Sequence, residues 1–452
     1  MRPNRSYGRR RLRRRVVVAR LGNVNRPLTN AGDHKGRGRP QGSRATTRVA
    51  PTGKLCSRIG SPSRVIVRTI ETRHCDAGWR NYHFVKVTTE DGVVGWSEYD
   101  EHQGAIGVTT VVDRLAPMVV GERVHDIERV YARLHARARQ SMSGVMAMGI
   151  GAIENALLDA KAKTLGVPCY DLLGGRVRDA VRVYWSHCGT WRISRPDFYP
   201  PGVTDLGGIR ALGEEVRERG FTALKTNVFD YSGERVRGWS PGFGFPYAPE
   251  QNVDRHVLRE LRKHLDAFRD GAGDDMDILL DLNYNAKPEG YLSILRSLAD
   301  FDLFWAEIDT PNPEALADVR SKSPHTISSC ESLITLYAFL PYFRLRAMDV
   351  AIIDAVWNGV WQSMKIAAAA EAHQVNVAPH NYYGHLATMM AAHMCAALPN
   401  VRIMETDIDR VPWDAELVTA VPDIRDSHLH LPDTPGWGTE PNEEALAKHP
   451  PK

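Results

Sequence analysis

Hydrophobic and polar residues first alternate regularly at Val65. The segments "RVIVRTIETR" and "HFVKVTTEDGVVGWSE" alternate with a period of two, which predicts β-strands, and Asp91-Gly92 predicts a hairpin turn. Apolar residues then recur at helical spacing over 107–118, 124–137 and 145–164. Residues 62–180 are therefore predicted to form a small α+β domain.

From residue 181 to about 410 the chain repeats one unit, a short apolar strand followed by a helix-like stretch. The predicted strands are "VRVYWSHCG", "FTALKTN", "DILLDLN", "LFWAEID", "TISSCES", "DVAIIDAV", "VNVAPHN" and "VRIMETD". Strands that are apolar throughout and separated by helices indicate a parallel sheet covered by helices. Eight such units predict a closed (β/α) barrel, with residues 411–452 as a separate C-terminal segment.

A series of polar residues marks the ends of the last six predicted strands. Its members are Asp281, Glu307, Glu331, Asp354, His380 and Glu405, which are 26, 24, 23, 26 and 25 residues apart. In a barrel these strand ends meet at one mouth, where active sites lie. Five carboxylates and a histidine at one mouth would repel one another without a cation among them. The series therefore predicts a functional site.

The types of residue in the series suggest proton abstraction beside a metal ion. Asp281, Glu307 and Glu331 on consecutive strands offer the all-oxygen ligand set that suits Mg²⁺. Such a cation would hold a substrate carboxylate and stabilise the enolate formed when the α-proton leaves. Asp354 on the strand next to His380 would orient its imidazole as the base.

Two further residues complete this predicted chemistry from other strands. Lys225, at the end of "FTALKTN", would hydrogen-bond the substrate carboxylate or help to neutralise its charge. Glu405, if protonated, would donate a hydrogen bond to the other enolate oxygen.

Charge separates the first 60 residues from the rest of the chain. They hold 15 Arg, 2 Lys and one acidic residue, whereas the whole chain has a net charge of only +4. Residues 1–61 are predicted to be a disordered basic tail. It is either a polyanion-binding arm or the product of a start codon assigned too early, and we favour the second. The acidic remainder makes nucleic acid an unlikely main ligand.

Cysteine spacing and hydropathy point to the cytoplasm. The six cysteines are scattered without a CxxC pair, which is typical of reduced thiols. No apolar run approaches the roughly 18 residues that a membrane span needs.

The chain from about residue 62 resembles the enolase superfamily, specifically its mandelate racemase group. The motifs that carry the resemblance are "MGIGAIENALLDAKAKTLGVPCYDLLGG", "ALKTN", the Asp281/Glu307/Glu331 series, Asp354 with "APHN", and "IMETD". The resemblance implies a modified (β/α)7β barrel and an N-terminal capping domain that residues 411–452 complete. It also implies Mg²⁺ at the three carboxylates and a homo-oligomer, often an octamer.

The residue two positions after Lys225 favours dehydration over racemisation. Racemases of this group carry Lys-x-Lys, whose second lysine is a base, whereas this chain has Asn227, which cannot accept a proton. Lys-x-Asn also resembles the galactonate-type dehydratases. The expected activity is dehydration of a sugar acid, an aldonate or aldarate, to a 2-keto-3-deoxy acid. A racemase or epimerase of a 2-hydroxy acid is the alternative. A non-catalytic protein with a nucleic-acid-binding tail ranks below both.

Several details differ from that family pattern or stay open. Galactonate-type dehydratases often have a histidine two residues after the first metal ligand, and it acts as the acid for the leaving group. This chain has Asn283 at that position, so the hydroxyl of Tyr284, Tyr382 or Tyr383 would have to replace the histidine as proton donor. His385 is a second candidate for the base, although His380 is preferred because it ends its strand. His187 is expected to be structural or a peripheral contact. The predicted substrate contacts are Asn283, His385, Tyr382, Trp79 and Arg80, with Arg80 favoured for a diacid.

Overall fold

The computed structural model describes residues 65–102, 105–241 and 251–452. The predicted disordered basic tail, residues 1–61, lies outside the described residues. The domain boundaries proposed from the sequence therefore stay predictions there.

The described chain begins with an antiparallel three-stranded sheet. Its strands are β1 (Val67–Asp76), β2 (Asn81–Thr89) and β3 (Val94–Tyr99), in the order β1-β2-β3. Three helices follow, namely α1 (Val108–Leu115), α2 (Ile127–Arg137) and α3 (Gly144–Leu165). This strand-hairpin-helix arrangement agrees with the sequence pattern.

Helix α3 is buried on nearly all sides because it packs between this sheet and the helices α11 (Ala355–Asn358) and α12 (Val360–Ala372). Its Asp159 accepts hydrogen bonds from the backbone N–H groups of Trp96 on β3 and Trp437 near the C-terminus, at 2.8 and 2.9 Å. On another face, Asn155 donates to the Ala355 carbonyl at 3.0 Å and accepts from the Val360 N–H at 2.7 Å.

All eight strands predicted for the barrel are present. They are β4 (Ala180–Ser186), β5 (Ala223–Thr226), β8 (Asp277–Asp281), β9 (Leu303–Glu307), β10 (Ile327–Ser329), β11 (Val350–Asp354), β12 (Asn376–His380) and β13 (Met404–Asp407). Neighbours from β4 to β12 pair in parallel and in chain order, and β13 pairs in parallel with β4. The ring closes where the Val377 N–H of β12 donates to Asn400 O at 2.9 Å and the Arg402 N–H donates to Val377 O at 2.8 Å.

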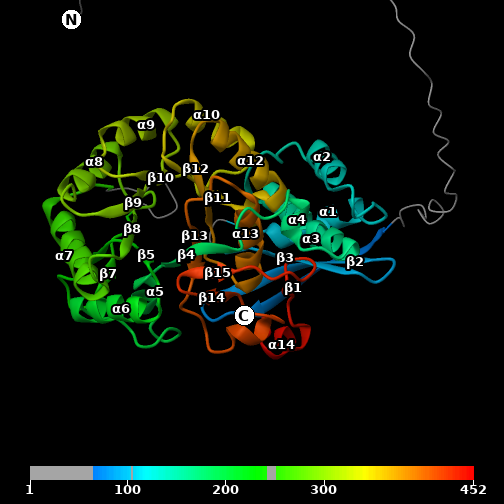
Figure 1. Ribbon diagram of the computed structural model, residues 1–452, viewed down its shortest axis with the longest axis horizontal. Coiled ribbons are helices and arrows are strands. Elements are labelled where there is room, and N and C mark those ends of the chain that lie inside the picture. Colours follow the sequence, from blue (N-terminus) through cyan, green and yellow to red (C-terminus); the bar gives the residue numbers. More distant parts are fainter. Residues whose placement is uncertain (1–64, 103–104, 242–250) are drawn as a thin grey trace, which may run out of the picture. The chain divides into compact units, whose positions relative to one another are not determined.

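Helices cover the outside of the strands, as Figure 1 shows for α6 to α10. The helices of this region are α4 (Cys169–Leu172), α5 (Thr190–Ser194), α6 (Leu206–Glu218), α7 (Arg255–Ala272), α8 (Pro288–Ser297), α9 (Pro313–Lys322), α10 (Leu336–Arg344), α11 (Ala355–Asn358), α12 (Val360–Ala372) and α13 (His385–Ala397). Inside the ring a separate buried cluster contains Tyr184 of β4 and Trp305 of β9, whose rings meet at 5.9 Å. Side chains of two non-neighbouring strands can meet in this way only in the interior of a barrel.

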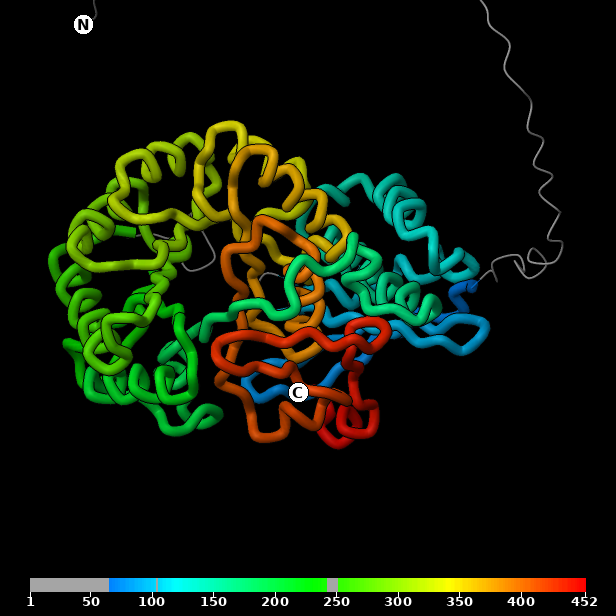
Figure 2. The backbone as a smooth tube through the Cα atoms, viewed as in Figure 1, coloured from blue at the N-terminus to red at the C-terminus, as the bar shows by residue number. Residues whose placement is uncertain are grey.

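The C-terminal segment returns to the N-terminal sheet, as the red end of the tube in Figure 2 shows. Its elements are β14 (Asp423–Arg425), β15 (His428–His430) and α14 (Glu443–Lys448), and β15 pairs antiparallel with β4. The Trp437 indole N–H donates to Trp96 O, and the Asp76 N–H donates to His449 O, both at 2.9 Å. The predicted fold class, a modified barrel with an N-terminal capping domain, is confirmed.

No helix among the described residues is long and apolar enough to cross a membrane.

Candidate active site

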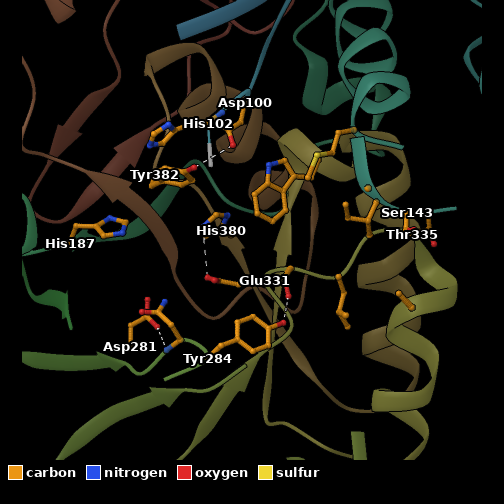
Figure 3. Close-up of a pocket in the computed structure, with 18 of the residues that line it drawn as sticks. Asp100, His102, Ser143, His187, Asp281, Tyr284, Glu331, Thr335, His380 and Tyr382 are labelled. Atoms are coloured by element: carbon orange, nitrogen blue, oxygen red, sulfur yellow. Dashed lines mark hydrogen bonds and ion pairs between the residues drawn. The ribbon is translucent and has the colours of Figure 1, made fainter. Parts of the chain in front are cut away.

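A cavity of about 990 Å³ lies at the carboxyl ends of the barrel strands (Figure 3). The barrel contributes charged residues to its wall, including Lys225, Asp281, Glu331 and His380. The N-terminal domain contributes residues from its loops and from α3. The cavity is therefore charged at its base and bordered by a second domain above it.

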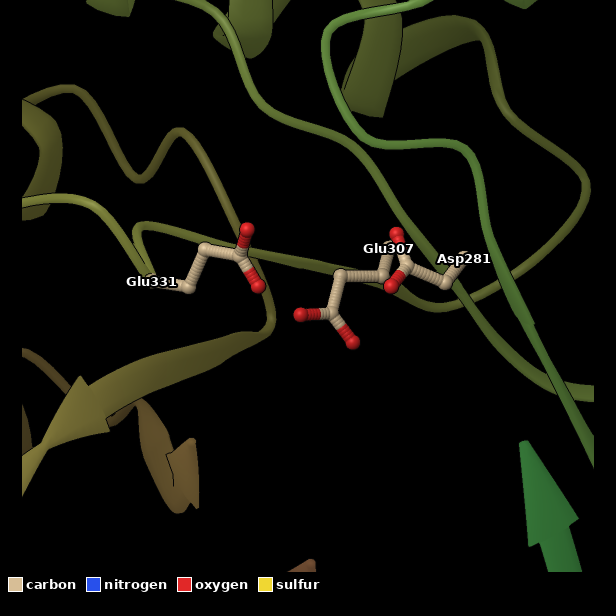
Figure 4. Close-up of side chains that lie close together, drawn as sticks. All are labelled: Asp281, Glu307 and Glu331. Atoms are coloured by element: carbon tan, nitrogen blue, oxygen red, sulfur yellow. The ribbon is translucent and has the colours of Figure 1, made fainter. Parts of the chain in front are cut away.

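Three carboxylates of successive strands lie close together (Figure 4), and two of them, Asp281 and Glu331, line the cavity. Asp281 ends β8, Glu307 ends β9 and Glu331 lies two residues beyond β10. One oxygen from each lies within 4.8 Å of the others, and Oε1 of Glu307 is buried without a hydrogen-bond partner. An unpartnered carboxylate oxygen inside a ring of acidic groups suits a cation.

Electrostatics at the three carboxylates support the same interpretation. Burial raises the pKa of Glu307 well above its usual range, and the neighbouring Asp281 and Glu331 raise it further against the opposing effect of Lys225. Burial and the charge of Asp309 raise the pKa of Glu331 to about 8. Since all the ligand atoms are oxygens, this donor set fits Mg²⁺.

The ammonium group of Lys225 forms ion pairs with neighbouring carboxylates. Its Nζ lies 2.9 Å from Glu405, 3.2 Å from Glu307 and 3.6 Å from Asp281. Burial alone would lower the pKa of Lys225, but the carboxylates raise it well above its usual range. Lys225 is therefore a firmly protonated side chain at the cavity wall.

Glu405 could donate a hydrogen bond to an enolate oxygen only if it were protonated, and it is not. Burial by itself would raise the pKa of Glu405, but the charges of Lys225 and His380 hold it well below its usual range. Its carboxylate also accepts hydrogen bonds from the Asn381 N–H, at 2.7 Å, and from the Ser186 hydroxyl. Glu405 is thus an ionised partner of Lys225, and it does not line the cavity.

His380 and Asp354 form the predicted pair at the ends of β12 and β11. Nδ1 of His380 lies 2.6 Å from Oδ2 of Asp354, and the Trp357 N–H and Tyr383 hydroxyl also donate to Asp354, at 2.7 and 2.5 Å. Because Asp354 accepts the Nδ1 proton, the Nε2 lone pair of neutral His380 is left toward the cavity, 3.7 Å from Glu331.

The surroundings make His380 a strong base. Burial alone lowers the pKa of His380, but the hydrogen bond to Asp354 and the charge of Glu331 more than offset it, raising the pKa to about 10. A cation held by Glu331 would offset that carboxylate's charge and bring the pKa of His380 down.

His385, predicted as a substrate contact and second candidate base, is placed elsewhere. It begins α13, and its Nε2 lies 2.7 Å from Asp414, bordering a different cavity together with Arg410. The first helical turn points the imidazole toward Asp414 rather than toward the barrel mouth, and contact of His385 with substrate stays a prediction.

Asn227 also does not line the cavity. Its amide oxygen accepts from the Thr190 hydroxyl at 2.8 Å, and its amide nitrogen donates to Asp281 O and to Asn283 Oδ1, both at 3.3 Å. Asn227 therefore connects the ends of neighbouring strands, and its catalytic role stays a prediction. Asn283 does line the cavity, with its backbone in the left-handed region at φ 45°.

Of the other predicted substrate contacts, Trp79 and Tyr382 line the cavity and Arg80 does not. Arg80 is buried, donates to the Tyr382 carbonyl and lies 3.7 Å from Asp407. Its guanidinium therefore already has protein partners, and its contact with a diacid stays a prediction. Between β5 and residue 241 the chain forms the short antiparallel pair β6 (Phe229–Asp230) and β7 (Arg237–Gly238).

Sequence reasoning missed part of the cavity wall. Trp191 on α5 and Trp357 on α11 line it, as does Met142 of the N-terminal domain. Neither tryptophan stands in a recognisable motif, so only the fold could have placed them. Asp100 and His102, which directly follow β3, also line the cavity.

Comparisons with known proteins agree with this architecture. The family model "Mandelate racemase / muconate lactonizing enzyme, N-terminal domain" matches residues 62–174, and "Enolase C-terminal domain-like" matches residues 208–445.

The chain is similar to proteins named as sugar acid dehydratases and to one named as an epimerase. The chain is 28% identical over 374 residues to the D-xylonate dehydratase of Haloferax volcanii, covering 81% of this chain and 84% of that protein. It is 30% identical to the D-gluconate dehydratase of Thermoproteus tenax, covering 83% and 71%. A crystal structure from Burkholderia xenovorans strain LB400, provisionally named an L-alanine-DL-glutamate epimerase and bound to magnesium and fumarate, is 60% identical with a TM-score of 0.84, covering 86% and 97%.

With both family models matched and the three carboxylates at the barrel mouth, the chain belongs to the mandelate racemase and muconate lactonizing enzyme family of the enolase superfamily.

Proposed function

We propose that the protein is a Mg²⁺-dependent hydro-lyase that converts a sugar acid to a 2-keto-3-deoxy acid. The observation that carries the proposal is His380, held by Asp354 beside the cluster of Asp281, Glu307 and Glu331. The names of the D-xylonate and D-gluconate dehydratases support it.

The residues divide the proton chemistry between them. When held by the three carboxylates, Mg²⁺ supplies positive charge against the negative charge that develops beside the substrate carboxylate. Nε2 of His380 accepts the α-proton, and Asp354 stabilises the resulting imidazolium through Nδ1. Lys225 donates a hydrogen bond to the substrate carboxylate and adds a fixed positive charge.

Dehydration is favoured over racemisation because one of the two faces of the substrate's α-carbon lacks a free base. Racemisation needs a proton acceptor opposite His380, and Lys225 on that side is protonated and paired with carboxylates. Its neighbour Asn227 cannot accept a proton.

The cavity favours an aldonate over an aldarate. Lys225 and three histidines (His102, His187 and His380) supply its basic side chains among the described residues, and no arginine lines it. A second substrate carboxylate would thus lack a bidentate partner. Trp79, Trp191 and Trp357 instead offer aromatic faces on which the C–H groups of a sugar can pack.

The test is an assay of 2-keto acid formation from a panel of aldonates and aldarates with Mg²⁺. We expect an aldonate to be turned over, and we expect His380→Asn to abolish both keto acid formation and exchange of the α-hydrogen with solvent deuterium. Unchanged turnover by His380→Asn would reject the proposed role of His380.

Epimerisation is the second candidate, because the Burkholderia xenovorans protein is named as an epimerase and is 60% identical. It predicts deuterium at the α-carbon of recovered substrate with inverted configuration and no keto acid. That result would replace dehydration as the proposed reaction.

A further inference from the structure

A second histidine–carboxylate pair borders the same cavity. His187 follows β4 and lines the cavity (Figure 3). Asp407 ends β13, and its Oδ1 lies 3.0 Å from Nδ1 of His187. The two strands are neighbours in the barrel, with Asp407 opposite Ser186. The register of the sheet therefore fixes this pair, as the ends of β11 and β12 fix Asp354 and His380.

The hydrogen bonds assign the proton positions on His187. The Ser186 hydroxyl donates to Glu405, so its proton is not available to Nδ1 of His187. Since Asp407 is an acceptor, Nδ1 carries the proton and donates to it. Nε2 of His187 has no hydrogen-bond partner among the described residues, so it is the atom that can exchange a proton with a bound molecule.

Asp407 is built to hold this imidazole. It is 3% exposed, and its second oxygen accepts from the Trp191 indole N–H at 3.1 Å. Arg80 lies 3.7 Å from the same oxygen and balances its charge. Arg80 thus belongs to the support of Asp407, which explains its absence from the cavity wall.

Two aromatic rings pack against the imidazole of His187. It stacks on Trp191 at 4.6 Å between ring centroids and meets the edge of Tyr382 at 5.9 Å. The same Tyr382 ring lies 5.1 Å from His380, so both imidazoles border one part of the cavity. The backbone of His187 has φ 47°, a left-handed conformation that persists only where the surroundings enforce it.

The three tyrosines that the sequence offers as substitute proton donors are already engaged. Tyr382 donates to Asp100 at 3.3 Å and Tyr383 to Asp354 at 2.5 Å, while the hydroxyls of Tyr284 and Ser332 bond to each other at 2.5 Å. Burial raises the pKa of each of these tyrosines. The position two residues after Asp281 is an asparagine, which has no proton to transfer.

We infer that His187 is the general acid that protonates the departing β-hydroxyl, with Asp407 as its positioning residue. This inference rests on the proposed dehydration. His380 takes the α-proton, the C–O bond breaks as the Nε2 proton of the His187 imidazolium passes to the hydroxyl oxygen, and water leaves. The enol product then gains the His380 proton at C3 and returns its hydroxyl proton to His187. Both histidines regain their starting states, and the products are the 2-keto-3-deoxy acid and water.

The test compares two leaving groups in the full-length protein with Mg²⁺. The substrates are the aldonate turned over by the wild type and its 3-deoxy-3-fluoro analogue, whose fluoride departs without a proton. For His187→Asn we expect keto acid formation from the hydroxy acid to fall about 10²–10⁴-fold, while fluoride release stays within about threefold of wild type. Exchange of the α-hydrogen with deuterium should persist. Asparagine suits the site because it tolerates the left-handed backbone and can still donate to Asp407.

Two further variants sharpen the result. His187→Gln, which places an amide near the Nε2 position without a transferable proton, should behave like His187→Asn. His256→Asn is the matched control, because His256 pairs with Asp230 at 3.0 Å on the surface, and it should change neither rate.

Each other outcome overturns the inference in a distinguishable way. Equal loss of both reactions in His187→Asn would show that His187 only shapes the cavity. A wild-type protein that exchanges the α-hydrogen but releases neither water nor fluoride would reject the proposed dehydration itself.

Discussion

At the scale of single residues, the position of a proton on His380 depends on Asp354. The carboxylate fixes Nδ1 as the protonated nitrogen and stabilises the imidazolium. For Asp354→Asn we expect kcat for keto acid formation to fall about 10²–10⁴-fold, because the amide can hold the other tautomer and provides no charge. Steady-state kinetics with a circular dichroism check of folding measures this. Asp230→Asn, in the surface pair with His256, is the control, and an unchanged kcat for Asp354→Asn would contradict the assignment.

Single residues also show which features of the site could not be predicted from the sequence. Trp79 and Arg80 are adjacent, yet Trp79 lines the cavity and Arg80 is buried against Asp407. Sequence spacing indicated the right loop, but a shift of one residue reverses which side chain faces the cavity. For His385 the sequence did not show that Asp414, 29 residues further along the chain, would be the partner of its imidazole. Residues that end barrel strands were predictable because the fold itself fixes their direction.

At the scale of elements, β3 packs on α3 with no room for a side chain at Gly95. A Cβ there would lie 2.3 Å from the Ala156 carbonyl oxygen and 2.6 Å from the Ala160 nitrogen, both backbone atoms. Gly95→Ala should therefore lower the free energy of unfolding by about 1–3 kcal/mol, because the strand and helix must separate. Urea unfolding measures it. Gly233→Ala, where the nearest atom lies 3.6 Å away, should have little effect, and equal losses would contradict the packing argument.

A buried glutamate joins β3 to α13 and predicts a pH dependence. Glu98 accepts from the N–H groups of Gly384 and Ala387, at 2.6 and 3.0 Å, and burial raises its pKa to about 7 despite those bonds and Arg410. The folded protein therefore holds a proton that the unfolded chain releases between about pH 4.5 and 7. Stability relative to Glu98→Gln should be greatest below that range, fall by up to roughly 3 kcal/mol as pH rises through it, and level off above.

Urea midpoints of wild type and Glu98→Gln at pH 4.5, 6, 7 and 8 measure this difference. The substitution removes one titrating group and leaves Arg410 in place, so other ionisations cancel in the comparison. A difference that grows with pH would show that Glu98 is ionised in the folded protein throughout.

At the scale of the whole molecule, the eight-strand barrel was predictable and the details of its cavity were not. The regular spacing from Asp281 to Glu405 reflects a repeated strand-helix unit, so topology follows from the sequence pattern. The cavity wall also depends on Trp191 and Trp357, which lie on short helices after β4 and β11. Their orientation is set by the packing of several elements, and no periodicity reports it.

If Asp281, Glu307 and Glu331 hold a cation as proposed, their mutual repulsion weakens the fold when none is bound, and Mg²⁺ should stabilise it. Asp281, Glu307 and Glu331 are close together, and their repulsion is relieved by a divalent cation. At a Mg²⁺ concentration about 100 times Kd, the free energy of unfolding should rise by about 2.7 kcal/mol. The thermal midpoint should therefore increase with Mg²⁺ and return after chelation by EDTA.

Controls must distinguish binding of Mg²⁺ at this site from a general effect of ionic strength on stability. Potassium chloride at equal ionic strength should leave the midpoint nearly unchanged, because monovalent ions only screen the exposed charges. Glu331→Gln should lose most of the Mg²⁺ shift, since one of three charged ligands is gone, whereas the exposed Glu289→Gln should keep it. A shift of the same size in Glu331→Gln would place the cation elsewhere. A wild type insensitive to Mg²⁺ at millimolar concentration would remove the metal site from the proposal.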